Sequence, residues 1–215
     1  ADVYIINTCS VTNMADRKSR QMIHRAKKNN PEAIIVAAGC YVQAAEEELA
    51  KKNEADILVG NNKKKDIAQI LEEYFAVKAV KEEQQVPLVS EVIDINHTKE
   101  YEDLTIHKVN EHTRAYIKIQ EGCDRFCSYC IIPFARGSVR SRRPSEILKE
   151  AESLVRAGFK ELILTGINAA LYGMEQGFVC DIDDTDIENM HGIEIIIHLL
   201  DKMPGDFRIR LSSLE

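Results

Sequence analysis

The stretch Tyr116-Ile-Lys-Ile-Gln-Glu-Gly-Cys-Asp-Arg-Phe-Cys-Ser-Tyr-Cys130 joins a strand-like run to a loop with three cysteines. Residues 116–120 predict a buried strand, and Cys123, Cys127 and Cys130 follow it directly. Three thiolates within eight residues can ligate three of the four irons of a 4Fe–4S cluster. The fourth iron is then free to bind a small chelating ligand.

Other uses of these cysteines are less consistent with the spacing. A zinc site usually takes a fourth Cys or His close by. A thioredoxin-like Cys-x-x-Cys would leave Cys123 unexplained. The chain has six cysteines, and cysteines this close together in a cytosolic enzyme indicate metal or redox chemistry rather than a disulfide framework. The sequence therefore predicts an iron–sulfur site.

Strands and helices alternate on both sides of this loop. The first part predicts a parallel sheet with helices on its faces, because its strands and helices follow one another in turn. Its strands are Val3–Ile6, Ala33–Ala37 and Ile57–Val59, and its helices are Asp16–Lys28, Ala44–Lys52 and Lys63–Phe75. The last part predicts a portion of a barrel with its chemistry in the loops after the strands. Its strands are Tyr116–Gln120, Lys160–Thr165 and Phe207–Leu211, and its helices are Ser145–Ala157 and Gly192–Met203.

These patterns predict an α/β protein of two domains, 1–75 and 109–215. The segment 76–108 between them is polar and mixed, and it includes Glu82-Glu83-Gln84-Gln85. We expect it to be a linker with some local structure.

The composition is that of a globular protein, with 45% hydrophobic and 29% charged residues among 215. No apolar run approaches the ~20 residues that cross a bilayer. No basic stretch precedes Val3–Ile6, so the start does not read as a signal peptide, and we expect a cytoplasmic protein. Because Ala1 and Glu215 both adjoin strand-like runs, we expect a fragment that lacks both termini.

Positive charge is concentrated in two segments, although the net charge is −7. Residues 16–28 carry six basic side chains against Asp16 alone. The second segment carries Arg136, Arg140, Arg142 and Arg143. Guanidinium groups suit both carboxylates and nucleic-acid phosphates, and Arg136 lies nearest the cysteines in sequence. A solvated surface is the alternative for the run.

The segment Thr165-Gly-Ile-Asn168 follows a predicted strand. Gly166 would let the backbone approach a ligand, and Asn168 could hydrogen-bond it. A plain turn is the alternative. The acidic run Asp181–Asp186 does not fit a calcium-binding EF-hand loop, because the required Gly and Glu are missing from its sixth and twelfth places.

Several motifs resemble a known family. Cys-x-x-x-Cys-x-x-Cys after a strand is similar to the signature of radical S-adenosylmethionine (SAM) enzymes. The longer run 119–137 resembles the methylthiotransferase subgroup of that family, and so do Asn7-Thr8-Cys9 and Gly39-Cys40-Tyr41-Val-Gln43. The resemblance implies that Tyr129 packs on the adenine of SAM.

The resemblance implies two 4Fe–4S clusters, bound SAM, and a Rossmann-like first domain before part of a radical SAM TIM barrel. One cluster sits on Cys123, Cys127 and Cys130. The other takes Cys9, Cys40 and a third cysteine in a family motif upstream of Ala1. On chemistry alone, Cys9 and Cys40 could share one metal at the rim of a parallel sheet, or be two buried thiols.

The family implies a radical reaction on a macromolecule. An electron donor such as flavodoxin or ferredoxin reduces the cluster, SAM is cleaved, and the deoxyadenosyl radical abstracts hydrogen. Family substrates are isopentenyl-adenosine in tRNA, a ribosomal-protein aspartate, and N6-threonylcarbamoyladenosine in tRNA. The runs 134–142, 164–168 and 210–215 resemble the last group. We therefore expect a tRNA methylthiotransferase; a non-catalytic iron–sulfur electron carrier is the alternative from another class.

Overall fold

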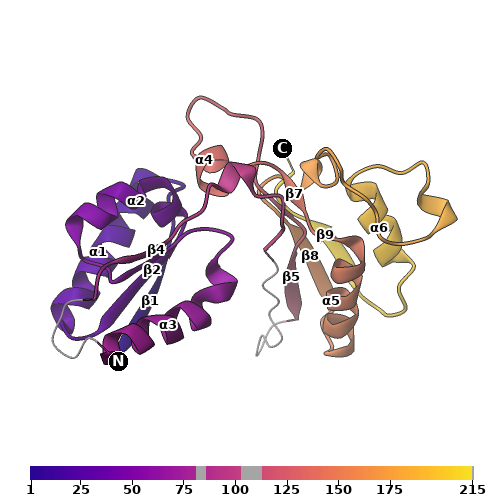
Figure 1. Ribbon diagram of the computed structural model, residues 1–215. Coiled ribbons are helices and arrows are strands. Elements are labelled where there is room, and N and C mark those ends of the chain that lie inside the picture. Colours follow the sequence, from indigo (N-terminus) through magenta and orange to yellow (C-terminus); the bar gives the residue numbers. More distant parts are fainter. Residues whose placement is uncertain (81–85, 103–112, 215) are drawn as a thin grey trace. The chain divides into compact units, whose positions relative to one another are not determined.

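The computed structural model describes residues 1–80, 86–102 and 113–214, and it divides into two compact units. The first unit holds Ala1–Thr98 together with Phe126–Gly137, and the second holds Lys99–Arg125 together with Ser138–Glu215. Figure 1 labels their elements. The Glu82–Gln85 run and the predicted domain start at residue 109 lie outside the described residues.

The first unit is built on a four-stranded, fully parallel sheet. Its strands lie in chain order: β1 (Val3–Thr8), β2 (Ile34–Gly39), β3 (Ile57–Val59) and β4 (Val89–Glu91). Every residue of β2 and β3 is buried. Strands buried on both faces read as continuous apolar runs, which is why Ile34-Ile-Val-Ala-Ala lacks alternation. The predicted parallel sheet is confirmed.

Helices cover both faces of this sheet (Figure 1). On one face, α1 (Asn13–Asn29) and α2 (Cys40–Lys52) pack Ile23, Tyr41 and Leu49 onto β1, β2 and β3. On the other face, α3 (Ile67–Val80), which follows the 3₁₀ turn η1 (Lys64–Asp66), buries Ile70 and Tyr74. The alternation of β2 side chains between these two cores is the two-residue period of a strand.

The segment between the predicted domains differs from the expected linker of 76–108. Helix α3 continues to Val80, β4 pairs with β3 as a sheet strand, and η2 (Ile95–His97) buries Ile95. Residues up to Thr98 therefore belong to the first unit. The Val89–Glu91 strand is too short to show the alternation that identifies a strand from sequence.

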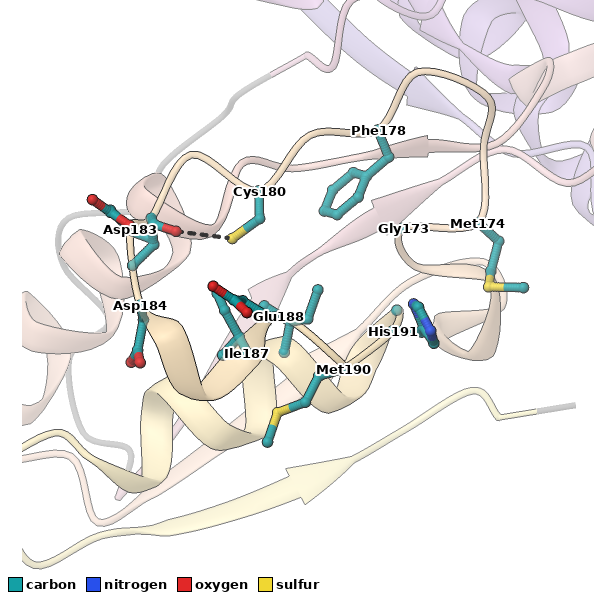
Figure 2. Close-up of a pocket in the computed structure, with 13 residues that line it drawn as sticks. Gly173, Met174, Phe178, Cys180, Asp183, Asp184, Ile187, Glu188, Met190 and His191 are labelled. Carbon is teal, nitrogen blue, oxygen red and sulfur yellow. Dashed lines mark hydrogen bonds between the residues drawn. The ribbon is translucent and has the colours of Figure 1, made fainter.

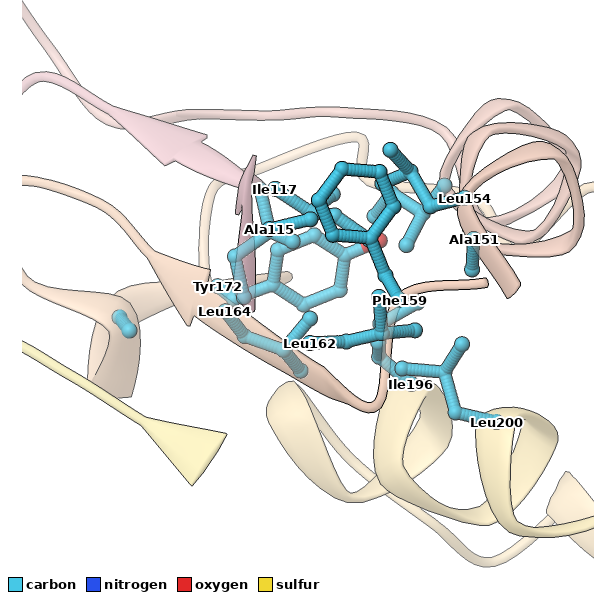
Figure 3. Packing of buried hydrophobic residues seen from close by; sticks show 13 residues of the cluster. Ala115, Ile117, Ala151, Leu154, Phe159, Leu162, Leu164, Tyr172, Ile196 and Leu200 are labelled. Carbon is cyan, nitrogen blue, oxygen red and sulfur yellow. The ribbon is translucent and has the colours of Figure 1, made fainter. Parts of the chain in front are cut away.

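The second unit contains a three-stranded parallel sheet, ordered β5 (Arg114–Lys118), β8 (Glu161–Thr165) and β9 (Arg208–Leu211). Helices α5 (Pro144–Arg156) and α6 (Ile193–Asp201) cover one face, and Figure 3 shows the buried side chains between them. This arrangement confirms the predicted β-loop-α units. The other face carries Tyr116, which is 67% exposed.

Both units also contain short helices, strands or turns. The antiparallel pair β6 (Gln120–Glu121) and β7 (Arg140–Ser141) belongs to the second unit, and α4 (Ile132–Arg136) to the first. The 3₁₀ turns η3 (Ala169–Leu171) and η4 (Thr185–Ile187) follow β8. Across the residues that the structure describes, none of the helices combines the length and the apolar character that crossing a bilayer requires.

Candidate functional site

The three cysteines of the predicted cluster occupy the loop after β6. Cys130 N–H donates to the Cys127 carbonyl at 2.9 Å, which closes a turn ahead of α4. Cys127 is exposed, Cys123 and Cys130 are half-buried, and all three are free thiols. Three accessible thiols from one short loop, none spent in a disulfide, fit a 4Fe–4S cluster with one open iron. Tyr129, between two of them in sequence, is 91% exposed, so its face is free to stack on a planar ligand.

A buried amide holds the start of this loop in place. The Gln120 side chain is fully buried, and its Nε2 donates to the carbonyls of Glu121 and Gly122 at 2.8 and 2.7 Å. Its Oε1 accepts from the N–H groups of Ile167 and Asn168, both at 3.0 Å. One side chain thus ties the residues before Cys123 to the loop after β8. Sequence analysis missed Gln120; the available signal was a polar residue at the end of an apolar strand.

The structure gives Gly166 and Asn168 local partners. A Cβ built at Gly166 would meet Gln120 Oε1 at 2.8 Å, so the missing side chain makes room for that amide. Asn168 is buried, and its Oδ1 accepts from Ala170 N–H at 3.1 Å at the start of η3. Both residues therefore shape the loop after β8, and their contact with a cofactor stays a prediction.

Cys9 and Cys40 come together at the rim of the first sheet. They directly follow Thr8 and Gly39, which are paired in the β1–β2 register. Gly39 has a φ of +101°, and a Cβ there would lie 2.8 Å from the Thr8 carbonyl, so only glycine fits this close approach. Cys9 is exposed and Cys40 is buried. The carboxyl ends of neighbouring parallel strands thus present two free thiols at one edge.

Two donors surround the buried thiol. Arg136 Nε donates to Cys40 Sγ at 2.9 Å, and Asn61 Nδ2 lies 3.6 Å from the same sulfur. Asn61 Nδ2 also donates to the Ala135 carbonyl at 2.6 Å. Hydrogen bonds to the ligating sulfurs are one means by which a protein tunes an iron–sulfur cluster. Cys9 and Cys40 therefore fit a metal–sulfur group at this rim, and the guanidinium of Arg136 contacts Cys40.

Of the four arginines at positions 136, 140, 142 and 143, two are buried and one is exposed. Arg142 is buried and forms ion pairs with Glu150 and Glu146 of α5. Arg140 is buried and donates to the Ser138 carbonyl at 3.2 Å. Only Arg143 of this run is exposed. Burial therefore removes two of the four arginines from the predicted contacts with tRNA phosphates.

Two carboxylates of the acidic loop pair with one lysine. Lys202 Nζ lies 2.8 Å from Asp184 and 2.7 Å from Asp186, and this ammonium lowers the pKa of the Asp184 carboxyl. Asp184, Asp186 and His198 come within 4.8 Å of one another, but the lysine already neutralises the two carboxylates. The rejection of a calcium loop here stays consistent with these contacts.

The same loop encloses a cavity of about 710 Å³ (Figure 2). Phe178, Ile187 and Met190 supply apolar lining, and Asp183 and Glu188 supply acidic lining. The Cys180 thiol donates to the Ile182 carbonyl at 3.8 Å, the contact that is dashed in Figure 2. The cavity contains none of the residues predicted to bind cofactor or metal.

Two family descriptions match separate parts of the chain. Residues 1–60 match the uncharacterized protein family UPF0004, and residues 117–213 match the radical SAM superfamily. The first match contains Cys9 and Cys40, and the second contains Cys123, Cys127 and Cys130.

The chain is also similar to named enzymes. It is 40% identical over 215 residues to the threonylcarbamoyladenosine tRNA methylthiotransferase MtaB of Bacillus subtilis (strain 168), spanning 100% of this chain and 44% of that protein. The MtaB of Aquifex aeolicus (strain VF5) is 42% identical over 91% of this chain and 46% of its own length. A tRNA-2-methylthio-N(6)-dimethylallyladenosine synthase of Staphylococcus haemolyticus (strain JCSC1435) is 38% identical over 81% of this chain and 33% of its own length. The chain thus spans less than half the length of these relatives.

A solved structure shares the fold. The radical SAM methyltransferase TsrM of Kitasatospora setae, solved with cobalamin and a [4Fe-4S] cluster bound, aligns with a TM-score of 0.51 at 13% identity. The alignment covers 79% of this chain and 38% of TsrM. At this identity the likeness concerns the α/β fold alone. Residues 1–60 therefore belong to the UPF0004 family and residues 117–213 to the radical SAM superfamily, joined in one chain.

Proposed function

We propose that this chain forms part of a radical SAM methylthiotransferase that modifies tRNA. The observation that carries the proposal is the pairing of two cysteine sets with whole-chain similarity to enzymes of that name. One set is Cys123, Cys127 and Cys130. The other is Cys9 and Cys40 at the rim of the first sheet. An electron carrier would need the first set but gives no reason for the second.

The loop cysteines would hold a 4Fe–4S cluster through three irons and leave the fourth for SAM. When bound, the cluster and SAM supply a radical that can take a hydrogen atom from an aromatic carbon. The protein's part is positioning. Gln120 fixes the backbone just before Cys123, and Tyr129 offers an exposed ring for the adenine. Gly166 and Asn168 lie in the adjacent loop after β8.

Cys9 and Cys40 would hold the second metal–sulfur group, which would supply the sulfur of the methylthio group, and a second SAM would supply its methyl. Arg136 and Asn61 direct N–H groups at Cys40, so they would hydrogen-bond the ligating sulfur there. A ferredoxin or flavodoxin would serve as the reductant.

The substrate we favour is N6-threonylcarbamoyladenosine in tRNA, because relatives that are 40% and 42% identical over 100% and 91% of this chain carry that name. The product would be its 2-methylthio derivative. Dimethylallyladenosine in tRNA is the second candidate, supported by the 38% identity to the synthase from Staphylococcus haemolyticus.

Nucleoside analysis of tRNA distinguishes the two substrates. We expect deletion of the gene in its host to remove 2-methylthio-N6-threonylcarbamoyladenosine and to leave the 2-methylthio-dimethylallyl nucleoside unchanged. Wild-type gene should restore the missing nucleoside, and the Cys127→Ala gene should not. Loss of the dimethylallyl derivative instead would reassign the substrate. No change in either nucleoside would contradict the function itself.

A further inference from the structure

Helix α1 carries four cations along one exposed stripe: Arg17, Lys18, Arg25 and Lys28. With about 100° of rotation per residue, these four side chains fall within an arc of roughly 100°. The buried residues Ser19, Ile23 and Ala26 lie on the roughly opposite side. Between Arg17 and Lys28 the stripe is about 16 Å long, from the rise per residue of an α-helix.

The stripe cations lack the partners that the other basic residues of α1 have. Arg20 donates to the Tyr41 hydroxyl and lies over its ring, and Lys27 pairs with Asp56. Within residues 1–80, 86–102 and 113–214, no carboxylate pairs with any of the four stripe cations. The only acid of α1, Asp16, faces away and accepts from Ser10 Oγ at 2.7 Å. Cations grouped on one face, in a chain of net charge −7, form a local positive field.

The helix that carries the stripe begins beside the cysteine rim. Cys9 N–H donates to Ser19 Oγ, and Ser19 Oγ donates back to the Cys9 carbonyl, both at 3.3 Å. Thr12 caps the first turn of α1 by accepting from Ala15 N–H at 3.1 Å. These bonds fix the Cys9 loop to the first two turns of the helix that carries Arg17 and Lys18.

We propose that the stripe binds the phosphate backbone of tRNA and holds the RNA beside the rim that carries Cys9. The choice of RNA as the partner rests on the proposed function. The location of the binding surface rests on the stripe. Arg and Lys side chains on an exposed helix face bind phosphates without reading sequence. The stripe therefore contributes affinity and position and leaves recognition of the modified base to other residues.

The test measures RNA binding by fluorescence anisotropy over a series of KCl concentrations. The probes are an anticodon stem-loop RNA that carries N6-threonylcarbamoyladenosine and the same stem-loop without it. The test variant is R17Q/K18Q/R25Q/K28Q. The control, K51Q/K78Q/K99Q/K149Q, removes the same charge from exposed lysines outside α1. Thermal melting and iron content should match wild type in both variants, because all eight side chains are exposed.

We expect the test variant to bind both RNAs about tenfold more weakly or worse, and the slope of log K against log salt to fall by about 2 to 3 units. The control should stay within about twofold of wild type. Equal weakening in both variants would assign the effect to net charge and overturn RNA binding by the stripe. Wild-type affinity in the test variant would also overturn it. Absence of RNA binding by the wild-type chain would overturn it too. None of these outcomes alters the nucleoside analysis, so failure of the stripe and failure of the methylthiotransferase assignment are distinguishable.

Discussion

Gln120 shows how one side chain can control a site that it does not itself form. Its amide makes four hydrogen bonds, two to the carbonyls before Cys123 and two from the loop after β8. Each of those backbone groups needs a partner, because a buried polar group without one costs about 1–3 kcal/mol. Replacing the amide therefore affects both loops together.

We expect Gln120→Ala to lower the free energy of unfolding by about 2–4 kcal/mol. Iron loading of the cysteine loop should fall with it, because the backbone before Cys123 loses its anchor. Chemical denaturation and iron analysis of the same preparation measure the two effects. Gln69→Ala, which removes an exposed amide from α3, is the matched control and should change neither. Wild-type stability and iron content in Gln120→Ala would refute this role.

Single residues also mark the limit of what the sequence predicts. Cys123, Cys127 and Cys130 were predictable because their spacing along the chain is itself the signal. The bonds from Arg136 to Cys40 and from Asn61 to Ala135 join residues 96 and 74 positions apart. Local spacing contains no information on such pairs, and so the contact between Arg136 and Cys40 could not be predicted.

Among the elements, α5 depends on an ion pair that lies inside the second unit. Arg142 and Glu150 are largely buried, and the Tyr172 hydroxyl donates to the Arg142 carbonyl at 2.7 Å. Burial raises the pKa of Tyr172, so that hydroxyl keeps its proton. Together these contacts join Arg142, which lies between β7 and α5, to the middle of α5 and to Tyr172 after η3.

We expect Glu150→Gln to destabilise the protein by about 2–4 kcal/mol, because it leaves a buried guanidinium short of its carboxylate. Glu152→Gln is the control on the same helix. It removes an exposed partner of Arg156 and should cost less than about 0.5 kcal/mol. Denaturant midpoints of both variants test the difference. Equal midpoints would mean that the Arg142–Glu150 pair does not stabilise α5.

The prediction of elements succeeded where the chain gives a long signal. Strands such as Ile34–Gly39 follow from a continuous apolar run. Helices such as Pro144–Arg156 follow from apolar periodicity and from a proline at the helix start. The structure adds β4 and α4, which have three and five residues. Elements this short take their conformation from tertiary partners, β3 in one case and α2 with η2 in the other.

At the scale of the whole molecule, the chain carries two sets of cysteines that serve one proposed reaction. The first unit supplies Cys9 and Cys40 on the rim of a parallel sheet. The loop 123–130 supplies three further thiols, and α1 supplies a cationic stripe. The α/β class and the alternating topology were predictable from the order of elements. The boundary between the units was not, because Phe126–Gly137 packs with residues far away in sequence.

The central claim is that Cys123, Cys127 and Cys130 hold a 4Fe–4S cluster. Iron and acid-labile sulfide analysis after anaerobic reconstitution tests it most directly, on wild type and on C123A/C127A/C130A. Cys180→Ala is the control, since its thiol is also half-buried but lies outside the loop. We predict that the triple variant contains about four irons and four sulfides fewer per chain than wild type, and that Cys180→Ala contains the same as wild type. A triple variant that is folded and loads as much iron and sulfide as wild type would contradict the account.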